Sequence, residues 1–566
     1  MLSSDLKSKI NKLWDKFWSR GITNPISAIE QISYLLFMRR IDELDTLKIQ
    51  QASFTEEDYR SIFLVPKVDK DGVPVINKNG ELEFEDMTNC RWSHFIQLDP
   101  DSMLNLVSQE AFPFIKVINK KIDLKKIEDE KVRAKVKKEL YGDLTDKEIE
   151  QEFAYVRYMQ NAVFLINNSN LLDEAVKAID EIYLVIKKQQ EEGQGFQDTQ
   201  GDVYEYLLNE IGQSGKNGQF RTPRHLIQLM CEILDPDWTD TICDPACGTG
   251  GFLLGAYQHI LTKYSSKDFL QKDENGFIRG TMGDKITKDT VWKNLKEKTF
   301  YGFDIDQTMV RIGLMNLMLH DISVPKIEHI DTLSNKYEGH EKDEQYSIVL
   351  ANPPFTGRID KGGMSDKFRI PGTQSELLFI DRMVRMLKPG GKAAIIIPEG
   401  VLFGTGKAQK KAREILLKDT QLEAVISLPS GAFQPYTGVK TAILVFTKVE
   451  LESKKYHTDK VWFYNLKSDG FTLDNSRKRQ KDEPLPLAVK SYQSRVKDNE
   501  TKRDGEHFYV DLQTIKDNGL DLSFNRYKEF DFTPQEYDPP QEILKTLLSL
   551  EKDIQKELNE LNEMIG

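Results

Sequence analysis

The segment Ile348-Val349-Leu350-Ala351-Asn352-Pro353-Pro354-Phe355 joins an apolar run to an Asn-Pro-Pro-Phe corner. Its apolar start predicts a buried parallel strand, and the two prolines end that strand because neither can donate to a strand ladder. Open α/β sheets bind ligands at the carboxyl ends of their strands. There, the Asn352 side chain and the Pro353 carbonyl would offer two acceptors beside the Phe355 ring. Such a corner suits an amino group on a flat ring, and a proline-rich loop without a ligand is the alternative.

Strand-like and helix-like segments alternate on both sides of this stretch, between about residues 191 and 450. Strands are expected at 241–244, 299–304, 327–330, 347–351, 393–398, 424–428 and 441–446, with helices at 251–263, 307–320, 375–387 and 407–418. This alternation predicts an α/β fold with a doubly wound, mostly parallel sheet. Because residues 429–440 are too few for a helical crossover, the last strand is expected to run antiparallel.

A glycine-rich turn follows the first of these strands, within the segment Thr241–Phe252. Glycines permit positive φ and let a ligand approach the backbone closely. A dinucleotide site would need an acidic residue about 20 positions after its glycines. This chain instead has Asp244 before the glycines and Asp304 much later, so a pyrophosphate site is disfavoured. Asp244 could accept from an ammonium group and Asp304 from two ribose hydroxyls, while Asp306 is expected to cap the next helix.

Composition narrows the class of protein. The length of 566 residues suggests three or four domains, at about 150 residues each. The net charge of -12 argues against coating nucleic acid by bulk charge, but allows a local basic groove or a nucleic-acid-binding partner. Without an apolar run of membrane-spanning length or a secretory signal at Met1–Asp5, we expect a cytoplasmic protein that does not contact membranes. The four cysteines are expected to be reduced, and their spacing predicts no metal site.

Residues 1–190 are expected to form a mostly helical N-terminal domain. Asn24-Pro25 is a typical helix start, with the Asn as cap and the Pro at the first helical position. Asp71-Gly72 and Asn79-Gly80 are hairpin-turn signals between short β-prone pieces, so a small β insertion is expected near them.

Residues 451–566 form a C-terminal extension, in which Trp462–Tyr464 is expected to add an edge strand. The basic run Arg477–Lys481 is interpreted either as a phosphate contact or as a solvated loop. Near the end, positions recur at alternating spacings of three and four, with Glu551 filling the one gap in an otherwise apolar series: Leu544, Leu547, Ile554, Leu558, Leu561 and Ile565. This heptad seam predicts an amphipathic helix that packs on this protein or on a partner.

Several of these motifs, in this order, resemble the motif series of S-adenosylmethionine-dependent N6-adenine DNA methyltransferases. They are Gly218–Arg224, Asp244–Phe252, Gly302–Asp306 and Asn352–Phe355. With the helical domain in front and Asp521–Tyr527 near the end, the chain resembles the modification (M) subunit of type I restriction–modification systems. The resemblance implies a Rossmann-like methyltransferase domain at 191–450, a helical domain before it, and a C-terminal extension at 451–566 ending in a partner-binding helix.

The resemblance also implies a role for each matched residue. Closure over the methionine end of S-adenosylmethionine would fall to Gln219, Phe220, Arg221, Thr222, Pro223 and Arg224. The cofactor's amino and carboxylate groups would be bound by Asp244, Ala246, Gly248, Thr249, Gly250 and Gly251. Asp304 would hold the ribose, and Asp331 would face the adenine amino group of the cofactor. The catalytic corner would consist of Asn352, Pro353, Pro354 and Phe355, without a metal.

The implied reaction moves a methyl group from S-adenosylmethionine to the N6 amino group of adenine in DNA. Acceptors at Asn352 and Pro353 would localise the lone pair of that amine, and Phe355 would stack on a base flipped out of the duplex. Phe433 and Tyr436 are candidates for a second ring, with simple packing as the alternative.

The implied partners are double-stranded DNA with a flipped adenine, a specificity (S) subunit, a second copy of this chain and a restriction (R) subunit. The chain carries no G-x-x-x-x-G-K-[ST] phosphate loop, and its tail is short for a two-part sequence-reading domain. Two other functions stay open: methylation of a protein glutamine, whose amide also presents an NH2 group, and a catalytically silent scaffold for assembly on DNA.

Overall fold

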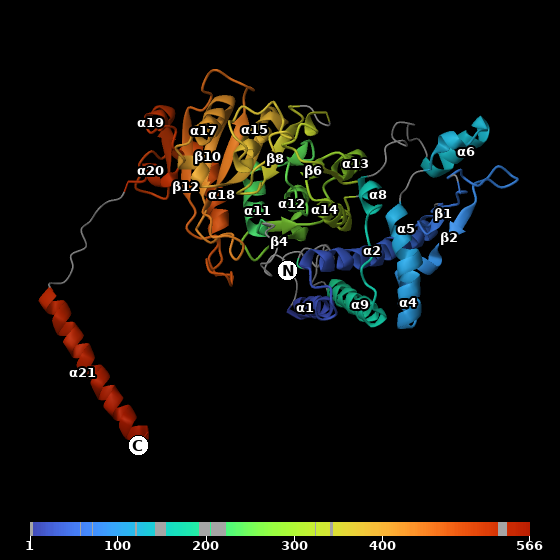
Figure 1. Ribbon diagram of the computed structural model, residues 1–566, viewed down its shortest axis with the longest axis horizontal. Coiled ribbons are helices and arrows are strands. Elements are labelled where there is room, and N and C mark those ends of the chain that lie inside the picture. The colour runs from blue at the N-terminus through green and yellow to red at the C-terminus, as the bar shows by residue number, and fades with distance from the viewer. Residues whose placement is uncertain are drawn as a thin grey trace.

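A nine-stranded mixed sheet forms the centre of the protein in the computed structural model (Figure 1). The structure describes residues 4–56, 58–70, 72–118, 122–141, 154–191, 204, 206, 222–322, 324–339, 343–529 and 540–565. The strand order is β13-β12-β10-β11-β9-β8-β3-β6-β7. These strands are β3 (Ile242–Asp244), β6 (Phe300–Asp304), β7 (Lys326–His329), β8 (Tyr346–Ala351), β9 (Leu387–Pro398), β10 (Thr420–Ser427), β11 (Thr441–Lys448), β12 (Lys460–Asn465) and β13 (His507–Asp511).

The direction of the strands follows the sequence prediction. β3, β6, β7, β8 and β9 pair in parallel, whereas β11 is antiparallel to both β9 and β10. The strands expected between residues 241 and 446 are all present, although β9 begins at Leu387 rather than at 393. Because the parallel strands share one direction, Asp244, Asp304 and Asn352 all lie at the carboxyl ends of the strands, on the same side of the domain.

Helices cover both faces of this sheet, which explains the unbroken apolar run before Asn352. Ile348 and Leu350 pack with α11 (Arg224–Leu234), α12 (Gly251–Lys263), α14 (Gln307–Leu319) and α18 (Pro484–Asp498). Val349 and Ala351 point to the other face and pack with α15 (Ser375–Met386) and α17 (Lys407–Asp419). Since successive strand residues face opposite sides, a strand buried on both faces must be apolar throughout.

Short elements connect these layers. They are the hairpin of β4 (Leu270–Lys272) and β5 (Ile278–Gly280), α13 (Asp289–Glu297), α16 (Gly400–Phe403), α19 (Leu512–Asp517) and α20 (Phe524–Tyr527). The β4–β5 hairpin and α13 lie between Asp244 and Asp304 in the chain. They account for the unusual length of that connection without adding a strand between β3 and β6 in the sheet.

The described part of the N-terminal region is mostly helical. Its helices are α1 (Ser4–Ser19), α2 (Pro25–Thr55), α3 (Trp92–Phe95), α4 (Pro100–Leu106), α5 (Phe112–Val117), α6 (Glu130–Tyr141), α8 (Ala154–Met159) and α9 (Ser169–Glu191). Asn24 caps α2 as predicted, because its side chain accepts from the Ile26 N–H at 3.0 Å. The expected β insertion is the antiparallel pair β1 (Leu64–Pro66) and β2 (Phe84–Asp86). Helices α2 and α8 contact α14, so this region packs on the sheet domain.

The C-terminal extension contributes to the central sheet. β12 runs parallel to β10, and β13 covers its other side. The prediction that Trp462–Tyr464 forms an edge strand is therefore wrong in one respect: the strand exists, but β13 holds the edge. Local sequence pattern cannot show this, because the covering strand comes more than 40 residues later (507 − 464 = 43). The sheet thus continues past residue 450, where we expected the catalytic domain to end.

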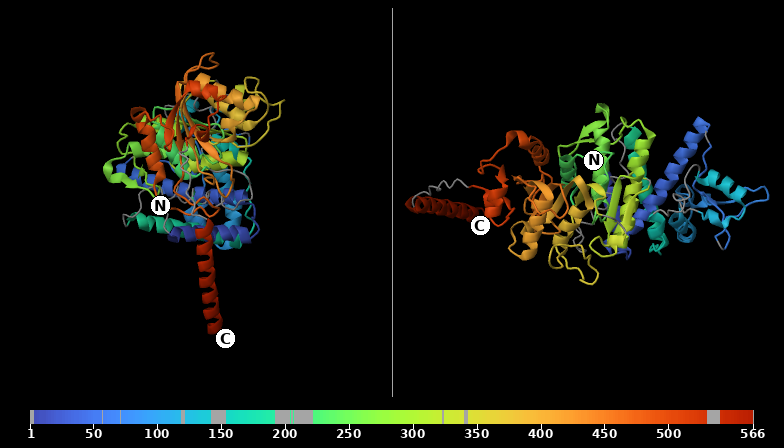
Figure 2. Two further views of the ribbon diagram at one scale, coloured as in Figure 1. Left: turned by 90° about the vertical axis from the view of Figure 1, so that its left-hand side faces the viewer. Right: turned by 90° about the horizontal axis from the view of Figure 1, so that it is seen from above.

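The chain ends in the long amphipathic helix α21 (Pro540–Ile565) (Figure 2). Its heptad residues Leu544, Leu547, Ile554, Leu558 and Leu561 are between 55% and 60% exposed. The predicted helix is therefore confirmed, and its described apolar side chains lie on the surface. Among the helices that the structure describes, none is long and apolar enough to cross a membrane.

Candidate active site

The glycine loop, Gly248–Gly251, joins the end of β3 to α12 by a turn that needs positive φ. Gly248 has φ +51° and Gly250 has φ +78°. The loop is tied to the neighbouring strand, because the Cys247 N–H donates to the Phe303 carbonyl at 2.8 Å. Helix α14 must come very close: a Cβ on Gly313 would lie 3.1 Å from the Gly248 carbonyl. The loop therefore rests against a glycine of a helix that lies some 60 residues away in sequence (313 − 251 = 62).

Asp244 and Asp304 end neighbouring strands beside this loop. Asp244 is buried, and its Oδ1 accepts from the Ala246 N–H at 3.0 Å. Asp304 accepts from the N–H groups of Gly248 and Asp306, each at 2.8 Å. Burial, together with the nearby charge of Asp304, raises the pKa of Asp244 to about 8, and burial also raises the pKa of Asp304. These two carboxyl groups are neighbours and are largely removed from water. The positive charge of a ligand would therefore stabilise their ionised forms.

The third strand end completes this side of the site. Asp331 follows β7, and its Oδ1 accepts from the Leu333 N–H at 2.9 Å. The hydroxyl of the buried Thr332 donates to the Pro245 carbonyl at 3.1 Å, which fixes the segment after β7 to the segment after β3. Asp306 caps α14, as predicted, by accepting from the Thr308 N–H at 2.8 Å. The structure therefore brings the sequence-predicted residues Asp244, Asp304 and Asp331 to adjacent strand ends.

The Asn352 corner follows β8, two strands from Asp304 in the sheet order. Both polar atoms of the Asn352 amide, Oδ1 and Nδ2, are buried without a hydrogen-bond partner among the described residues. Leaving such an atom unpaired costs about 1–3 kcal/mol, so the amide is suited to a ligand that offers both a donor and an acceptor. Pro353 is buried and Pro354 is exposed, so the chain turns outward after the corner.

Phe355 is buried and meets Phe433 edge to face, with ring centroids 5.5 Å apart and planes at 89°. Phe433 comes from the loop between β10 and β11, which we considered as a source of a second ring. In this structure the ring packs on Phe355. A flat ligand that stacks on Phe355 therefore has to share this space with Phe433 or displace it.

The predicted closing segment is only partly described. Gln219, Phe220 and Arg221 lie outside the described residues. Thr222 is buried, and Pro223 precedes the first residue of α11, Arg224. Arg224 and Gly251 both line a cavity of about 390 Å³ between α11, α12 and the β4–β5 hairpin, whose walls include neither Asp244 nor Asp304.

The start of α11 is fixed by the C-terminal extension. The ring of His225 lies 3.0 Å from the buried carboxylate of Asp469 and stacks on Phe471, with centroids 4.6 Å apart. Arg477 forms an ion pair with the same carboxylate, and Arg479 donates to backbone carbonyls. Two cations of the basic run are thus engaged within the protein, which favours an internal structural role for them over the phosphate contact and the solvated loop that we weighed.

Two residues near the site were missed by sequence reasoning. Asn316 is buried in α14 and donates to the Thr249 carbonyl at 2.8 Å, so it supports the glycine loop. Ile305 follows Asp304 and is 69% exposed, which leaves an apolar surface beside that carboxylate. The Asn within an otherwise apolar helix pattern could have indicated the role of Asn316. The exposure of Ile305 follows only from the turn between β6 and α14.

Comparison with known proteins places these features in a family context. The profile of the N-6 DNA methylase family matches residues 196–535, and that of the HsdM N-terminal domain matches residues 6–179. The chain is 26% identical to the type I restriction enzyme EcoEI methylase subunit of Escherichia coli, over 96% of this chain and 94% of that protein. It is 32% identical to the EcoKI methylase subunit of Escherichia coli K12, over 48% of this chain and 49% of that protein.

Solved structures share the fold. A chain from a structure of type I restriction–modification complex assembly superposes with a TM-score of 0.60 at 24% identity, covering 99% of this chain and 98% of that one. A type I methyltransferase subunit from Streptococcus thermophilus superposes with a TM-score of 0.59 at 19% identity, covering 93% of this chain and all of that one (100%).

Proposed function

Because the chain belongs to the N-6 DNA methylase family, as the methylase subunit of a type I restriction–modification system, we propose that Asn352 and Pro353 grip the target amine. The protein transfers a methyl group to the N6 amino group of adenine in DNA. The observation that carries our assignment is the Asn352 amide, whose two polar atoms are buried and have no hydrogen-bond partner within the described ranges. Adenine presents an N–H donor beside a ring-nitrogen acceptor, which is the complement of an amide.

The residues at the corner would act on the lone pair of the amine. That lone pair is delocalised into the adenine ring, so the nitrogen is a poor nucleophile. Asn352 Oδ1 and the Pro353 carbonyl can each accept one N–H of the amine, which favours a pyramidal nitrogen with a localised lone pair. Phe355 offers a ring face for stacking, which offsets part of the few kcal/mol that base flipping costs. No strong base is needed, since positioning supplies much of the rate.

Membership of this methyltransferase family implies use of S-adenosylmethionine, and the residues at the strand ends fit that cofactor. When bound, it supplies an electrophilic methyl group on a sulfonium centre. We assign Asp244 to its ammonium group, because this buried acid forms no ion pair with a basic side chain of the described residues. The glycine loop with Ala246 would take the carboxylate, and Asp304 would accept from the ribose hydroxyls. Asp331 would face the cofactor's adenine amino group.

The closing segment belongs to the same proposal. Gln219, Phe220, Arg221, Thr222, Pro223 and Arg224 would cover the methionine end of the cofactor. Support comes from α11, which begins at Arg224 and packs on α12 directly after the glycine loop. The two helices pack closely because Gly255 of α12 leaves room for Ile227 of α11. A Cβ atom on residue 255 would lie 2.4 Å from Ile227 Cγ2.

Type I methylase subunits act on DNA together with other subunits. We propose that α21 binds one of these subunits. The exposed seam of α21 is suited to a helix of the specificity subunit, since an apolar stripe gains stability only when a partner covers it. A second copy of this chain and a restriction subunit are further proposed partners. The proposal includes a cytoplasmic location beside the DNA, an N-terminal domain at 1–190, and a catalytic domain at 191–450 whose sheet is completed by β12 and β13 of the extension at 451–566.

The test is reconstitution. Purified chain, specificity subunit, labelled S-adenosylmethionine and DNA should yield labelled N6-methyladenine, and label on cytosine or on protein would contradict the assignment. Asn352→Ala should abolish transfer and leave cofactor affinity within about twofold, because the amide contacts only the base. Asn335→Ala, in an exposed loop, is the matched control and should transfer normally.

A further inference from the structure

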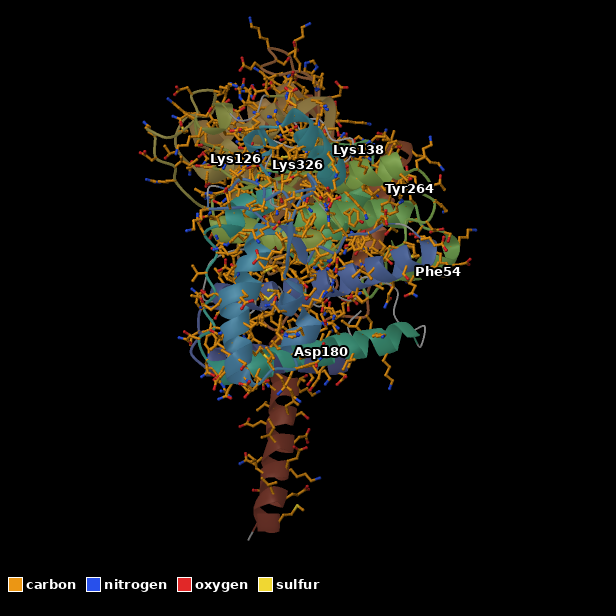
Figure 3. All side chains as sticks on the ribbon, turned by 90° about the vertical axis from the view of Figure 1, so that its right-hand side faces the viewer. Phe54, Lys126, Lys138, Asp180, Tyr264 and Lys326 are labelled. Atoms are coloured by element: carbon orange, nitrogen blue, oxygen red, sulfur yellow. The ribbon has the colours of Figure 1, made fainter. Side chains whose placement is uncertain are left out.

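β7 is the last strand of the sheet, so one side of its backbone has no strand partner in the part of the chain that the structure describes. Exposed edges of this kind are usually covered or blocked. Here helix α8 of the N-terminal region lies against β7, and the two elements are in contact. Figure 3 views the molecule from this side and labels Lys326, the first residue of β7. The N-terminal region therefore covers the edge strand that lies next to Asp304 and Asp331, the carboxylates that we assign to cofactor binding.

Tyr158 of α8 makes the central contact. Its hydroxyl donates to Glu328 Oε2 at 2.8 Å and accepts from the His329 N–H at 2.7 Å. Arg157 adds an ion pair to the same Glu328 oxygen at 3.0 Å. The hydroxyl thus uses its donor and an acceptor site on two adjacent residues of β7, one through a side chain and one through the backbone. Tyr158 is itself buried, whereas Glu328 is partly exposed, so these bonds are partly shielded from water.

The contact passes directly to the turn after β6. The His329 ring nitrogen Nε2 lies 2.8 Å from the Ile305 carbonyl. A carbonyl can only accept, so Nε2 must carry the proton and donate. The Tyr158 ring meets the His329 ring edge to face, with centroids 6.3 Å apart. A chain of polar contacts therefore runs from α8 through His329 to the residue that follows Asp304.

A second contact from the N-terminal region reaches the first turn of α14, directly after the Asp304–Asp306 turn. Glu30 of α2 and Arg311 of α14 are both buried, and Arg311 Nε donates to Glu30 Oε1 at 2.6 Å. Arg311 also donates to the Thr308 hydroxyl at 3.1 Å, in the first turn of the helix that Asp306 caps. The N-terminal region is thus linked to the Asp304–Asp306 turn twice, through β7 to Ile305 and through α14 to Asp306, which accepts from the Thr308 N–H.

We propose that the N-terminal helical region is part of the cofactor site, with Tyr158 and Glu30 as positioning residues that hold the Asp304–Asp306 turn in its binding geometry. Neither residue would touch the cofactor. Movement of this region away from the sheet would then weaken cofactor binding. This inference rests on the proposed function, because it assigns Asp304 to the ribose.

Cofactor affinity of the full chain is the test, measured by calorimetry with S-adenosylmethionine. Tyr158→Phe removes the hydroxyl but keeps the ring, and should weaken binding about five- to tenfold, as expected for lost buried hydrogen bonds. Glu30→Gln should weaken it in the same direction. Tyr183→Phe is the matched control: it removes the hydroxyl of another buried tyrosine, on α9, and should change affinity less than about twofold.

Two further readouts separate positioning from general destabilisation. With DNA and the specificity subunit, Tyr158→Phe should raise the KM for the cofactor and leave kcat unchanged at saturation. The double variant Tyr158→Phe/His329→Ala should bind no more weakly than the weaker single variant, because both act through one route. Wild-type affinity in Tyr158→Phe, or additive losses in the double variant, would overturn the inference. A wild-type chain that binds no S-adenosylmethionine would instead overturn the proposed function.

Discussion

Binding of S-adenosylmethionine should release a proton from Asp244, and the size of that release follows from the structure. In the free chain the pKa of Asp244 is raised to about 8, chiefly by burial. At pH 6.5 a group with that pKa is about 97% protonated, whereas the cofactor's α-amino group, with an ordinary pKa near 7.8, is about 95% charged. If the ammonium group pairs with an Asp244 carboxylate, the complex should lose about 0.9 proton. Ionising Asp244 costs about 2 kcal/mol at this pH, so affinity should rise as pH rises towards 8.

Calorimetry in two buffers of different ionisation enthalpy measures this release. Wild-type chain should show about 0.9 proton lost at pH 6.5, and its affinity should increase up to about tenfold per pH unit between pH 5.5 and 7.5. Asp244→Asn keeps the shape of the neutral acid but cannot ionise, so it should release no proton and show a flat profile in that window. This variant separates Asp244 from Asp304, whose pKa burial also raises. A wild-type release below about 0.2 proton would refute the reasoning.

The same raised pKa links folding stability to pH. The unfolded carboxyl ionises near pH 3.9, whereas the folded one stays neutral up to about 8, so its contribution is complete below pH 4 and is lost as pH rises through about 8. Within that window the free wild-type chain should lose up to about 1.4 kcal/mol of stability per pH unit relative to Asp244→Asn. Denaturant titrations of both proteins at pH 5, 6 and 7 measure this difference, and parallel curves would contradict it.

Three further changes probe packing and assembly. Gly255→Ala places a Cβ 2.4 Å from Ile227 Cγ2 and should destabilise the fold by about 1–3 kcal/mol. Gly400→Ala is the control, because its Cβ would have nothing within 4 Å, and it should not destabilise the fold. Equal melting temperatures of the two variants would contradict this prediction. Gly313→Ala places a Cβ 3.1 Å from a carbonyl of the glycine loop and should weaken S-adenosylmethionine binding in calorimetry, so unchanged affinity would count against the loop assignment. Deleting Pro540–Ile565, whose described side chains are exposed, should leave melting temperature and cofactor affinity unchanged and abolish co-purification with the specificity subunit; retained assembly would place that interface elsewhere.

Elements that depend on local interactions could be predicted from the amino-acid sequence. The unbroken apolar run before Asn352 predicted a strand buried on both faces, and Ile348 and Val349 do pack on opposite faces. Glycines after Asp244 predicted a turn with positive φ, and the short link after β10 predicted the antiparallel β11. Each of these depends on neighbours within a few residues. The positions of the motifs at the ends of predicted parallel strands were enough to place the carboxylates and the Asn352 corner at the carboxyl ends of these strands.

Contacts between residues far apart in the sequence could be seen only in the folded chain. β13 took the edge that Trp462–Tyr464 was expected to hold, and Asp469 from the extension holds His225 at the start of α11. Tyr158 reaches β7 across 170 positions of sequence. Such contacts depend on how packed layers bring surfaces together, and neither periodicity nor spacing records them. The same is true of the Asn352 amide, because only the surrounding fold shows that no group among the described residues pairs with it.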